Sequence, residues 1–483
     1  MELTKTLIMA FVLSASLVAP RARGDVVFET LVSFTYTNGP DYGAFGVGSR
    51  SGAMVQGTDG NLYGTTPTGG VTSNVAGYFG TIFEMTPQGA FTSLYLFGTE
   101  FGPNNGNDNG HWPQGNLIQG ADGNLYGTTQ YGGQPNGGTV FRISTNGGLT
   151  TVYAFGNNAG YDSQLGWTNY DGDAPIAGLL QGSDGNFYGT TTSYGAYGNG
   201  TVFQLTPGGV LTNLHSFTAL NSGDSYENPD GANPTGELIL GKDGNFYGTT
   251  TQGGTNDYGT VFRITAGGQF TTLHSFSSAS GSGYGGLVQG NDGNLYGTTS
   301  GGNGTIFQMT TNGDFTTLHT FDVTDGSTPE AALIQGSDGN FYGTTDGGGP
   351  NGWYGTVFRI TANGVLTTLH SFNGADGSNS SAALVQASDG SLYGTTSRGA
   401  AGAGTIFRIV VPPVFQSITQ TNGSVALVWS VMPGQKYQLQ YNTDLSSSHW
   451  QNLGSANIAS NVTAFASDSV ARPQCLYRIL LTP

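Results

Sequence analysis

The string Asp184-Gly-Asn-Phe-Tyr-Gly-Thr-Thr191 decides the fold, because close copies of it recur along the chain. Each copy reads Asp-Gly, then Asn or Ser, then Leu or Phe, then Tyr-Gly-Thr-Thr. Self-similarity of this kind is the signature of solenoids, propellers and other repeat architectures. The copies begin at Asp59, Asp122, Asp184, Asp243, Asp292, Asp338 and Asp389. The chain therefore contains seven tandem units.

Every unit supplies four segments of strand length. In the third unit they are Gly178–Gln181, Asn186–Thr191, Thr201–Leu205 and Val210–Phe217. β-branched and aromatic residues populate these segments, and turns such as Asp-Gly-Asn and Thr-Pro-Gly-Gly separate them. Phe187 and Tyr188 point to opposite faces of the second segment, so we expect a sheet that is buried on both faces. Such sheets are typical of propeller blades.

The two ends of the repeat array complement each other. The seventh unit stops after Gly404–Ile409 and runs into Pro412-Pro413 without a fourth strand. The missing pattern occurs at the N-terminus, in Phe28-Glu-Thr-Leu-Val-Ser-Phe34. A strand borrowed from the opposite end closes a ring, whereas an open solenoid, the alternative, has no need of it. The sequence predicts an all-β fold with a seven-bladed β-propeller over residues 25–411, closed by its N-terminal strand.

The repeat resembles the bacterial tandem-repeat family called GloVer. The resemblance rests on Asp-Gly-Asn-Leu-Tyr-Gly-Thr-Thr, the Gly-Gly pair and Gly-Thr-Val-Phe, and it covers about residues 28–410. It implies a cell-surface or secreted β-rich repeat protein of the choice-of-anchor kind, but it assigns no activity to any residue. Because Tyr477–Pro483 contains neither an apolar span nor a basic tail, we expect release or docking by the last domain rather than covalent anchoring.

A different pattern follows the double proline. Apolar residues alternate over Val425–Trp429 and again over Tyr437–Tyr441, which is typical of half-buried strands. Residues 412–483 resemble a fibronectin type III or related immunoglobulin-like β-sandwich, although they are few enough for one strand to be absent. This domain is expected to be either a docking module or an inert spacer.

The N-terminus has the features of an export signal. A charged start precedes an apolar run, Leu7–Ala19, and the small residues Ala22 and Gly24. We expect residues 1–24 to be a signal peptide that is cleaved before Asp25. A membrane anchor is the alternative, but the run is shorter than the ~20 residues that cross a bilayer. The protein is thus expected outside the cell or on its surface, or in the periplasm, with no membrane span after signal removal.

The composition of the chain disfavours nucleic acid as a partner and excludes an intramolecular disulfide bond. An excess of 30 acidic over 13 basic residues gives a net charge of −17, which repels nucleic acid. The single cysteine, Cys475, excludes an intramolecular disulfide and is expected to be a buried small residue rather than a nucleophile. Aromatic residues make up 12% of the chain, enough to fill cores. We expect a monomer.

Candidate ligand-binding residues lie in two sets of connections. Those between the second and third strands, and those that lead to the next unit, emerge on one face and carry the most variable sequence. Exposed aromatic side chains near carboxyl and amide groups suit sugar rings, unless they pack on their own loops. The candidate residues are Trp112, Trp167, Tyr170, Tyr226, Trp353 and Tyr354.

Neither a metal nor another cofactor is predicted. The recurring aspartates sit singly in hairpins, where they are expected to cap backbone amides. Asp171-Gly-Asp173 comes nearest to a calcium loop but lacks further ligands. Histidines recur at one position of the fourth strand, where a packing role is expected because strands of different blades lie too far apart to share an ion. They are His215, His274, His319 and His370.

No nucleophile with its base and no carboxylate pair stands out. Glu100, Glu227, Glu237 and Glu330 include candidate acids and bases for sugar cleavage, which needs two carboxyl groups about 5–10 Å apart. We therefore predict a secreted or cell-surface, non-enzymatic binding or scaffold protein whose partner is an extracellular glycan or a surface protein. A carbohydrate-active hydrolase or lyase is the alternative, and a structural coat protein is a further one.

Overall fold

The chain folds into β-strands and turns. The computed structural model describes residues 26–35, 52–69, 79–98, 109–156, 159–162, 166–218, 228–283, 285–400, 402–421, 424–443, 449–468 and 475–482. Within these ranges no helix long and apolar enough to span a membrane occurs, and the elements are all strands. The all-β prediction is confirmed. The predicted signal peptide, residues 1–24, lies outside the described residues.

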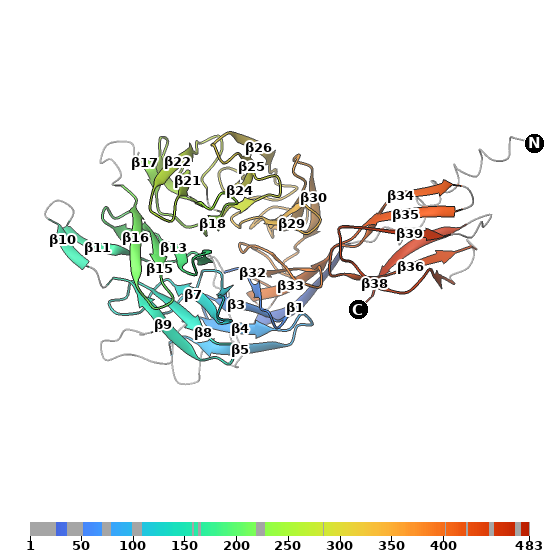
Figure 1. Cartoon of the computed structure of the whole chain (residues 1–483), viewed down its shortest axis with the longest axis horizontal. Coiled ribbons are helices and arrows are strands. Elements are labelled where there is room, and N and C mark those ends of the chain that lie inside the picture. The colour runs from blue at the N-terminus through green and yellow to red at the C-terminus, as the bar shows by residue number, and fades with distance from the viewer. Residues whose placement is uncertain are drawn as a thin grey trace, which may run out of the picture.

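Seven four-stranded antiparallel sheets with one common strand order follow one another along the described part of the repeat array (Figure 1). Their first strands are β2 (Val55–Gln56), β6 (Ile118–Gln119), β12 (Leu180–Gln181), β18 (Ile239–Leu240), β23 (Val288–Gln289), β27 (Ile334–Gln335) and β31 (Val385–Gln386). The second strands are β3 (Leu62–Thr66), β7 (Leu125–Thr129), β13 (Phe187–Thr191), β19 (Phe246–Thr249), β24 (Leu295–Thr299), β28 (Phe341–Thr344) and β32 (Leu392–Thr396).

The third strand of each sheet is largely buried, whereas the fourth strand, at the edge, is mostly half-buried or exposed. The third strands are β4 (Thr81–Met85), β8 (Thr139–Ile143), β15 (Thr201–Leu205), β21 (Thr260–Ile264), β25 (Thr305–Met309), β29 (Thr356–Ile360) and β33 (Gly402–Val410). The fourth strands are β5 (Phe91–Leu96), β9 (Leu149–Ala154), β16 (Leu211–Ser216), β22 (Phe270–Ser275), β26 (Phe315–Thr320), β30 (Leu366–Ser371) and, for the seventh sheet, β1 (Val27–Thr35).

The seventh sheet takes its outer strand from the other end of the repeat array. β1 pairs antiparallel with β33. The ring of Phe28 on β1 stacks on the ring of His370 in the sixth sheet, with 3.7 Å between their centroids. His215 and Phe270 make the equivalent contact between the third and fourth sheets at 4.0 Å. β1 thus has the strand pairing and the neighbour contacts of an ordinary fourth strand.

Hydrophobic cores lie between neighbouring sheets. Each core draws side chains from two consecutive sheets, as Tyr126 of the second sheet and Phe187 of the third illustrate. An equivalent core joins Phe83 of the first sheet to Tyr393 of the seventh. Every residue of the second strand β7 is buried, which explains why both of its faces carry apolar or small side chains.

The repeated motif holds each sheet together internally. In all seven units the motif aspartate accepts the hydroxyl hydrogen of the motif tyrosine at 2.6–2.9 Å. It also accepts the backbone N–H two residues later at 2.9–3.1 Å, so it caps the hairpin as predicted. The last motif threonine hydrogen-bonds to the threonine that opens the third strand, at 2.7–3.0 Å.

The recurring histidines pack, as predicted. Three of them hydrogen-bond to an aspartate in the following connection at 2.8–3.0 Å, in the pairs His215–Asp230, His319–Asp325 and His370–Asp376. The ring of His274 instead stacks on Phe315, with 4.2 Å between the centroids. In the described part of the chain, no group of three or more His, Cys, Asp or Glu side chains is placed to hold a metal ion.

Two small sheets extend the connections of the third and fourth units. They are formed by β10 (Ala159–Asp162), β11 (Gly166–Asp173) and β14 (Ser193–Gly195), and by β17 (Asn228–Ala232) and β20 (Gln252–Gly254). β11 and β17 belong to the connections that lead into these units, and β14 and β20 to the connections between second and third strands. Strand pairing therefore continues beyond the four-stranded sheets into the connections of these two units.

The C-terminal domain consists of two further sheets. One contains β34 (Val414–Thr421), β35 (Ser424–Ser430) and β39 (Thr463–Asp468), and the other contains β36 (Lys436–Asn442), β37 (Gln451–Asn452), β38 (Asn457–Ile458) and β40 (Leu476–Leu481). The buried side chain of Trp429 lies in the core between them. Cys475, expected to be buried, is only half-buried.

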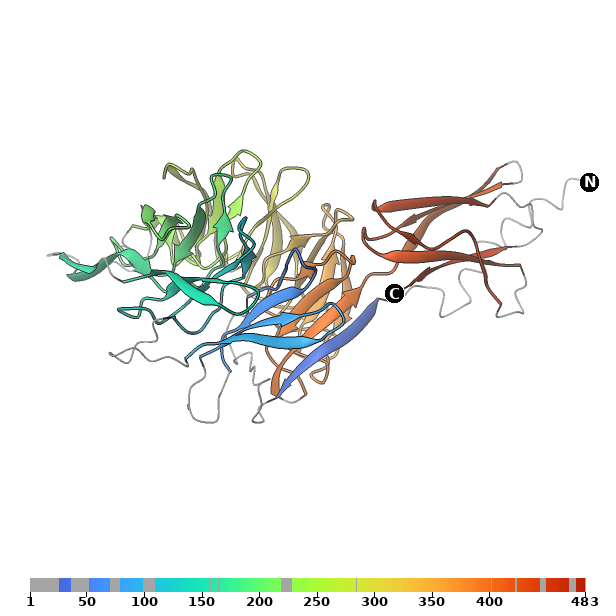
Figure 2. The ribbon, with the colours of Figure 1, turned by 60° about the horizontal axis from the view of Figure 1, so that its bottom comes forward.

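The C-terminal domain rests against the seventh repeat sheet (Figure 2). Met432 is buried in the core that contains Leu384 and Leu392 of that sheet. Gly434 approaches the carbonyl oxygen of Ser388 so closely that a β-carbon at residue 434 would lie 1.9 Å from it. A buried side chain and a close approach of two backbones therefore join the two parts.

Candidate functional site

The candidate site is the loop face, which we define as the side where the connections between second and third strands and the connections between units emerge. Five units carry a residue with φ between 54° and 59° at one equivalent position of this face. A non-glycine residue in this left-handed region costs about 1–2 kcal/mol, so tertiary contacts must impose it. We call these residues the nodes. They are Trp112, Ala174, Asn233, Thr328 and Asn379.

Each node ties its unit to the preceding one through the backbone. The node N–H donates to a carbonyl of the preceding unit at 2.8–3.1 Å, and the acceptor residues are Phe79, Gly137, Asn199, Asn303 and Tyr354. The node carbonyl accepts an N–H from its own unit at 3.0–3.3 Å, and the donor residues are Gln130, Thr192, Thr251, Asp346 and Ser397. The backbone of the loop face is therefore the same at five junctions, whereas the side chains there differ.

Exposed aromatic side chains of the repeat array gather on the loop face. In the described repeat residues, those exposed by 39–66% are Trp112, Tyr170, Tyr194, Tyr197, Trp353 and Tyr354. All six belong to β11, β14 or the connections that form this face. Four of the predicted residues are among them. Trp167 lies in β11 with its side chain outside the described structure, and Tyr226 lies outside the described residues.

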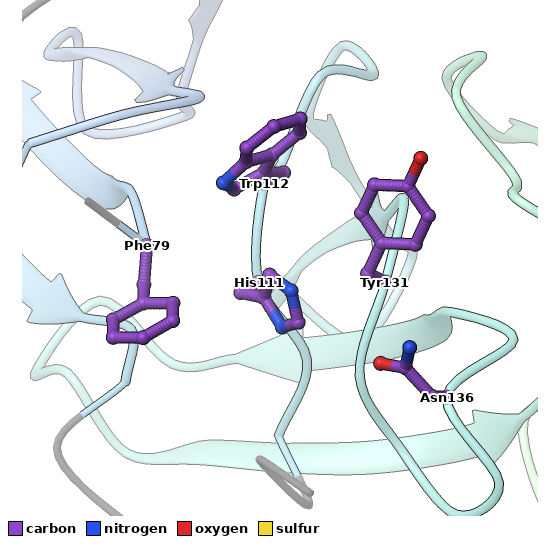
Figure 3. Close-up of a pocket in the computed structure, with 5 residues that line it drawn as sticks. All are labelled: Phe79, His111, Trp112, Tyr131 and Asn136. Carbon is purple, nitrogen blue, oxygen red and sulfur yellow. The ribbon is translucent and has the colours of Figure 1, made fainter. Parts of the chain in front are cut away.

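An open apolar pocket of about 480 Å³ lies at the junction of the first and second units (Figure 3). Its lining residues are Phe79, His111, Trp112, Tyr131 and Asn136. The ring of His111 meets Phe79 edge-on at 5.5 Å, and Trp112 meets Tyr131 edge-on at 5.5 Å. His111 and Tyr131 also exchange two backbone hydrogen bonds of 2.8 and 3.2 Å. The pocket is thus a rigid arrangement of rings around one node.

The apolar pocket carries no charge at neutral pH. Burial lowers the pKa of His111, so its imidazole is neutral. The amide oxygen of Asn136 accepts the N–H of Gly132 at 2.8 Å, so its NH₂ group is one of the polar donors in the lining. Such a pocket suits the apolar face of an uncharged ring.

A second polar feature lies where the first strands begin. The amide of Asn116 in the second unit donates to the carboxylate of Glu237 in the fourth unit at 2.6 Å, and its oxygen accepts the N–H of Ala53 at 2.5 Å. The third unit has Gly178 between them, where a β-carbon would lie 3.0 Å from both side chains. The surrounding protein raises the pKa of Glu237 to about 7, because burial disfavours the charged carboxylate.

Glu237 has no second carboxyl as a hydrogen-bond partner among the described residues. Of the other glutamates considered for catalysis, Glu330 is half-buried, and Glu100 and Glu227 lie outside the described residues. Among these candidate acids and bases, Glu237 is the carboxyl group for which the structure shows a raised pKa.

Sequence reasoning missed the nodes, although it located the connections that contain them. A signal was present: proline follows the node directly in four units, as Pro113, Pro175, Pro234 and Pro329. Each proline ring packs against the glycine that precedes the third strand of the preceding unit. At Gly304, for example, a β-carbon would lie 2.2 Å from the ring of Pro329. The recurrent proline and glycine thus mark a junction between units rather than a loop of free conformation.

The fold and the loop face define a tandem-repeat β-protein. On its loop face the same backbone hydrogen bonds recur at five junctions, whereas the side chains differ. The chain belongs to the Gloeobacter/Verrucomicrobia repeat family, whose repeat matches residues 21–168, 161–335 and 235–427. This confirms the resemblance to the GloVer family. No relative was found among curated proteins.

Solved structures similar to this chain include a gluconolactonase from Xanthomonas campestris, with 14% identity, 60% of this chain and 83% of the other covered, and a TM-score of 0.35. A PQQ-bound aldose sugar dehydrogenase from Streptomyces coelicolor has 14% identity, coverages of 62% and 93%, and a TM-score of 0.38. A luciferin-regenerating enzyme has 10% identity, coverages of 80% and 95%, and a TM-score of 0.38. Likeness at this level transfers neither activity nor site residues to this chain.

Proposed function

We propose that this chain is an exported, non-enzymatic binding protein that recognises an extracellular glycan through its loop face. The main support for this proposal is the set of backbone hydrogen bonds made by the nodes. The same backbone hydrogen bonds recur at five junctions, while the side chains at the nodes range from Ala174 to Trp112. A fixed backbone with variable exposed side chains is the arrangement of a recognition surface, because loops carry binding residues on a rigid scaffold.

The scaffold in this proposal is a closed, seven-bladed β-propeller. Pairing of β1 with β33 supports closure, as does the shared core of the first and seventh sheets. A side-chain bond supports it as well: the N–H of Ser388 in the seventh unit donates to the side-chain oxygen of Gln56 in the first at 2.7 Å. The same bond links consecutive units elsewhere, for example Ala121 to Gln181 at 3.0 Å. Strand pairing, a shared core and this side-chain bond at the junction of the last and first units therefore support the proposed closure.

The C-terminal domain would act as a docking module of the immunoglobulin type. Its pairings β34–β35–β39 and β36–β40 correspond to the A–B–E and C–F pairings of an immunoglobulin-like sandwich. Export to the cell exterior rests on the signal pattern of residues 1–24.

A glycan fits the chemistry of the loop face better than the other ligands considered. Exposed indole and phenol rings offer flat apolar surfaces to the C–H face of a sugar ring, and their polar edges remain available for hydrogen bonds. The net charge of −17 disfavours anionic polymers. The uncharged ring-lined pocket around Trp112 is suited to a neutral ring.

A glycan array probed with the purified chain tests this proposal. The matched variant combines Phe79→Asn with Trp112→Asn, since Asn199 and Asn233 already occupy these two positions in other units. We expect the variant to fold normally and to lose at least about tenfold in affinity for the bound glycan. Val210→Ala, at an exposed site outside the loop face, is the control. If the double variant binds the glycan as tightly as the wild type, the pocket is not the binding site. If the wild type binds no glycan, the proposed ligand class is wrong.

A carbohydrate-active hydrolase or lyase is the second candidate, and the raised pKa of Glu237 favours it. A carboxyl group with a pKa of about 7 has the proton affinity of a general acid or base at neutral pH. Release of reducing sugar by the purified chain, abolished in Glu237→Gln, would establish this activity and overturn the non-enzymatic proposal. Assembly of the purified chain into fibres or lattices without glycan binding would instead favour a structural coat protein.

A further inference from the structure

The junction of the sixth and seventh units holds a carboxylate in a fixed orientation. The side-chain amide of Asn379, the node of the seventh unit, donates to Oδ2 of Asp346 at 3.1 Å and to its backbone oxygen at 3.2 Å. The hydroxyl of Ser378 in turn donates to the amide oxygen of Asn379 at 3.1 Å. The backbone N–H of Asp346 donates to the node carbonyl of Thr328 at 3.1 Å. Asp346 is therefore held by two successive nodes.

One oxygen of this carboxylate is available to a ligand. Asp346 is partly exposed, and its Oδ1 accepts no hydrogen bond from the described residues. Burial raises the pKa of Asp346, and the positive charge of the nearby Arg398 opposes this rise. Arg398 is exposed, and its backbone pairs with Ser378 next to the node. An acceptor and a charged donor thus stand together on the loop face.

Two aromatic side chains from the connection that contains Asp346 also lie at this junction. Trp353 is 66% exposed, the most exposed aromatic side chain of the described repeat residues. Its ring lies against Gly347, next to Asp346, since a β-carbon at residue 347 would be 3.5 Å from the indole. Tyr354 is 40% exposed, and its ring packs on Gly374. Nothing in the internal packing of the repeat requires an indole ring so open to solvent.

We infer that this junction is a second ligand subsite, distinct from the apolar pocket, which binds a neutral hexopyranose ring. Trp353 provides the surface for the C–H face of the sugar, Asp346 accepts hydrogen bonds from its hydroxyl groups, and Arg398 donates to them. The charges of Asp346 and Arg398 offset each other, so neither an anionic nor a cationic sugar gains a net attraction. The inference rests on the proposed glycan-binding function and specifies where and how one ring of the glycan is bound.

The test is a titration of the full chain with methyl glucoside, methyl mannoside and methyl galactoside, with glucuronate and glucosamine as charged comparators. Binding is followed by protection of tryptophan fluorescence from acrylamide, because Trp353 is the most exposed described indole. The key variant is Asp346→Ser, which introduces the residue found at the equivalent positions Ser300 and Ser397. Trp353→Ala is the second variant. Val365→Ala, an exposed change in the same unit but away from the loop face, is the control.

We expect at least one neutral glycoside to protect the chain from quenching. Asp346→Ser should weaken that binding at least about tenfold, Trp353→Ala should abolish the protection, and the control should behave as the wild type. Preferential binding of glucuronate or glucosamine would overturn the neutral class. A bound glycoside whose affinity is unchanged in Asp346→Ser and Trp353→Ala would overturn the subsite.

The two proposals fail in different ways. In the first case the chain binds the glycan array, the Phe79→Asn/Trp112→Asn variant loses this binding, and Asp346→Ser and Trp353→Ala keep it. This result refutes the second subsite and leaves the proposed function standing. Absence of binding to both the array and the glycosides refutes the proposed function and the subsite together.

Discussion

At the residue scale, the repeat distinguishes side chains that hold the unit from side chains that vary. The motif Asp, Tyr and Thr form the same hydrogen bonds in every unit, so their chemistry is used internally. The node position accommodates Ala174, Thr328 and Trp112 because the hydrogen bonds that recur at every node are made by its backbone. Exchange of residues between equivalent positions therefore tests function without disturbing the fold.

Thr345 tests the internal role of the last motif threonine. Its hydroxyl pairs with Thr356 at 3.0 Å, accepts the N–H of that residue at 2.9 Å and donates to the carbonyl of Gly347 at 3.0 Å. Thr345→Val leaves buried polar groups without partners, so we expect it to lower the free energy of unfolding by about 1–3 kcal/mol. Urea unfolding measures this cost. Thr367→Val, at an exposed position of β30, should change the free energy of unfolding by less than about 0.5 kcal/mol. Equal losses of stability in Thr345→Val and Thr367→Val would contradict the internal role of the Thr345 hydroxyl.

Glu237 should make stability depend on pH. Its pKa rises from 4.5 to about 7 on folding, so the folded state retains the proton that the unfolded state releases between these values. Its stabilising contribution is therefore complete below about pH 4.5 and is lost as the pH rises through about 7. Glu237→Gln keeps an acceptor for Asn116 without a charge. We expect it to raise stability at pH 8 by up to roughly 3 kcal/mol, less where the carboxylate keeps solvent contact, and to leave stability at pH 4 unchanged.

Thermal unfolding of the wild type and Glu237→Gln from pH 4 to pH 8 checks this expectation. Parallel profiles for the two proteins would show that the proton on Glu237 is not coupled to folding.

At the element scale, β1 is the strand that joins the two ends of the repeat array. It lies at the N-terminal end of the repeat array, yet it completes the last repeat sheet. Its Phe28 stacks on His370 and also meets Phe372 and Phe407. Phe28→Ala removes these contacts, and we expect it to cost about 2–4 kcal/mol. Val27→Ala, at a side chain that is 54% exposed on the same strand, should be almost neutral. A similar melting temperature for both variants would contradict the role of β1 in joining the ends.

At the scale of the whole molecule, Met432 is a central part of the contact between the C-terminal domain and the repeat array. Met432 is only 2% exposed and belongs to a core of the repeat array rather than to the core around Trp429. Met432→Ala should therefore lower the melting temperature of the repeat array, at a cost of about 2–4 kcal/mol. Phe465→Ala, in a side chain of the same domain that is 83% exposed, should have little effect. Calorimetric scans in which Met432→Ala leaves unfolding of the repeat array unchanged would show that the two parts fold independently.

The sequence by itself determined the seven units, their four-strand pattern, the capping role of the motif aspartates and the family. These features depend on contacts within a unit or on patterns repeated in every unit, so they can be read locally. Only the tertiary structure revealed the nodes, the Asn116–Glu237 pair and the setting of Asp346 beside Asn379. Each of these joins residues from different units, and their side chains follow no repeated pattern. They meet because the stacking of sheets brings distant positions together, which local propensity cannot indicate.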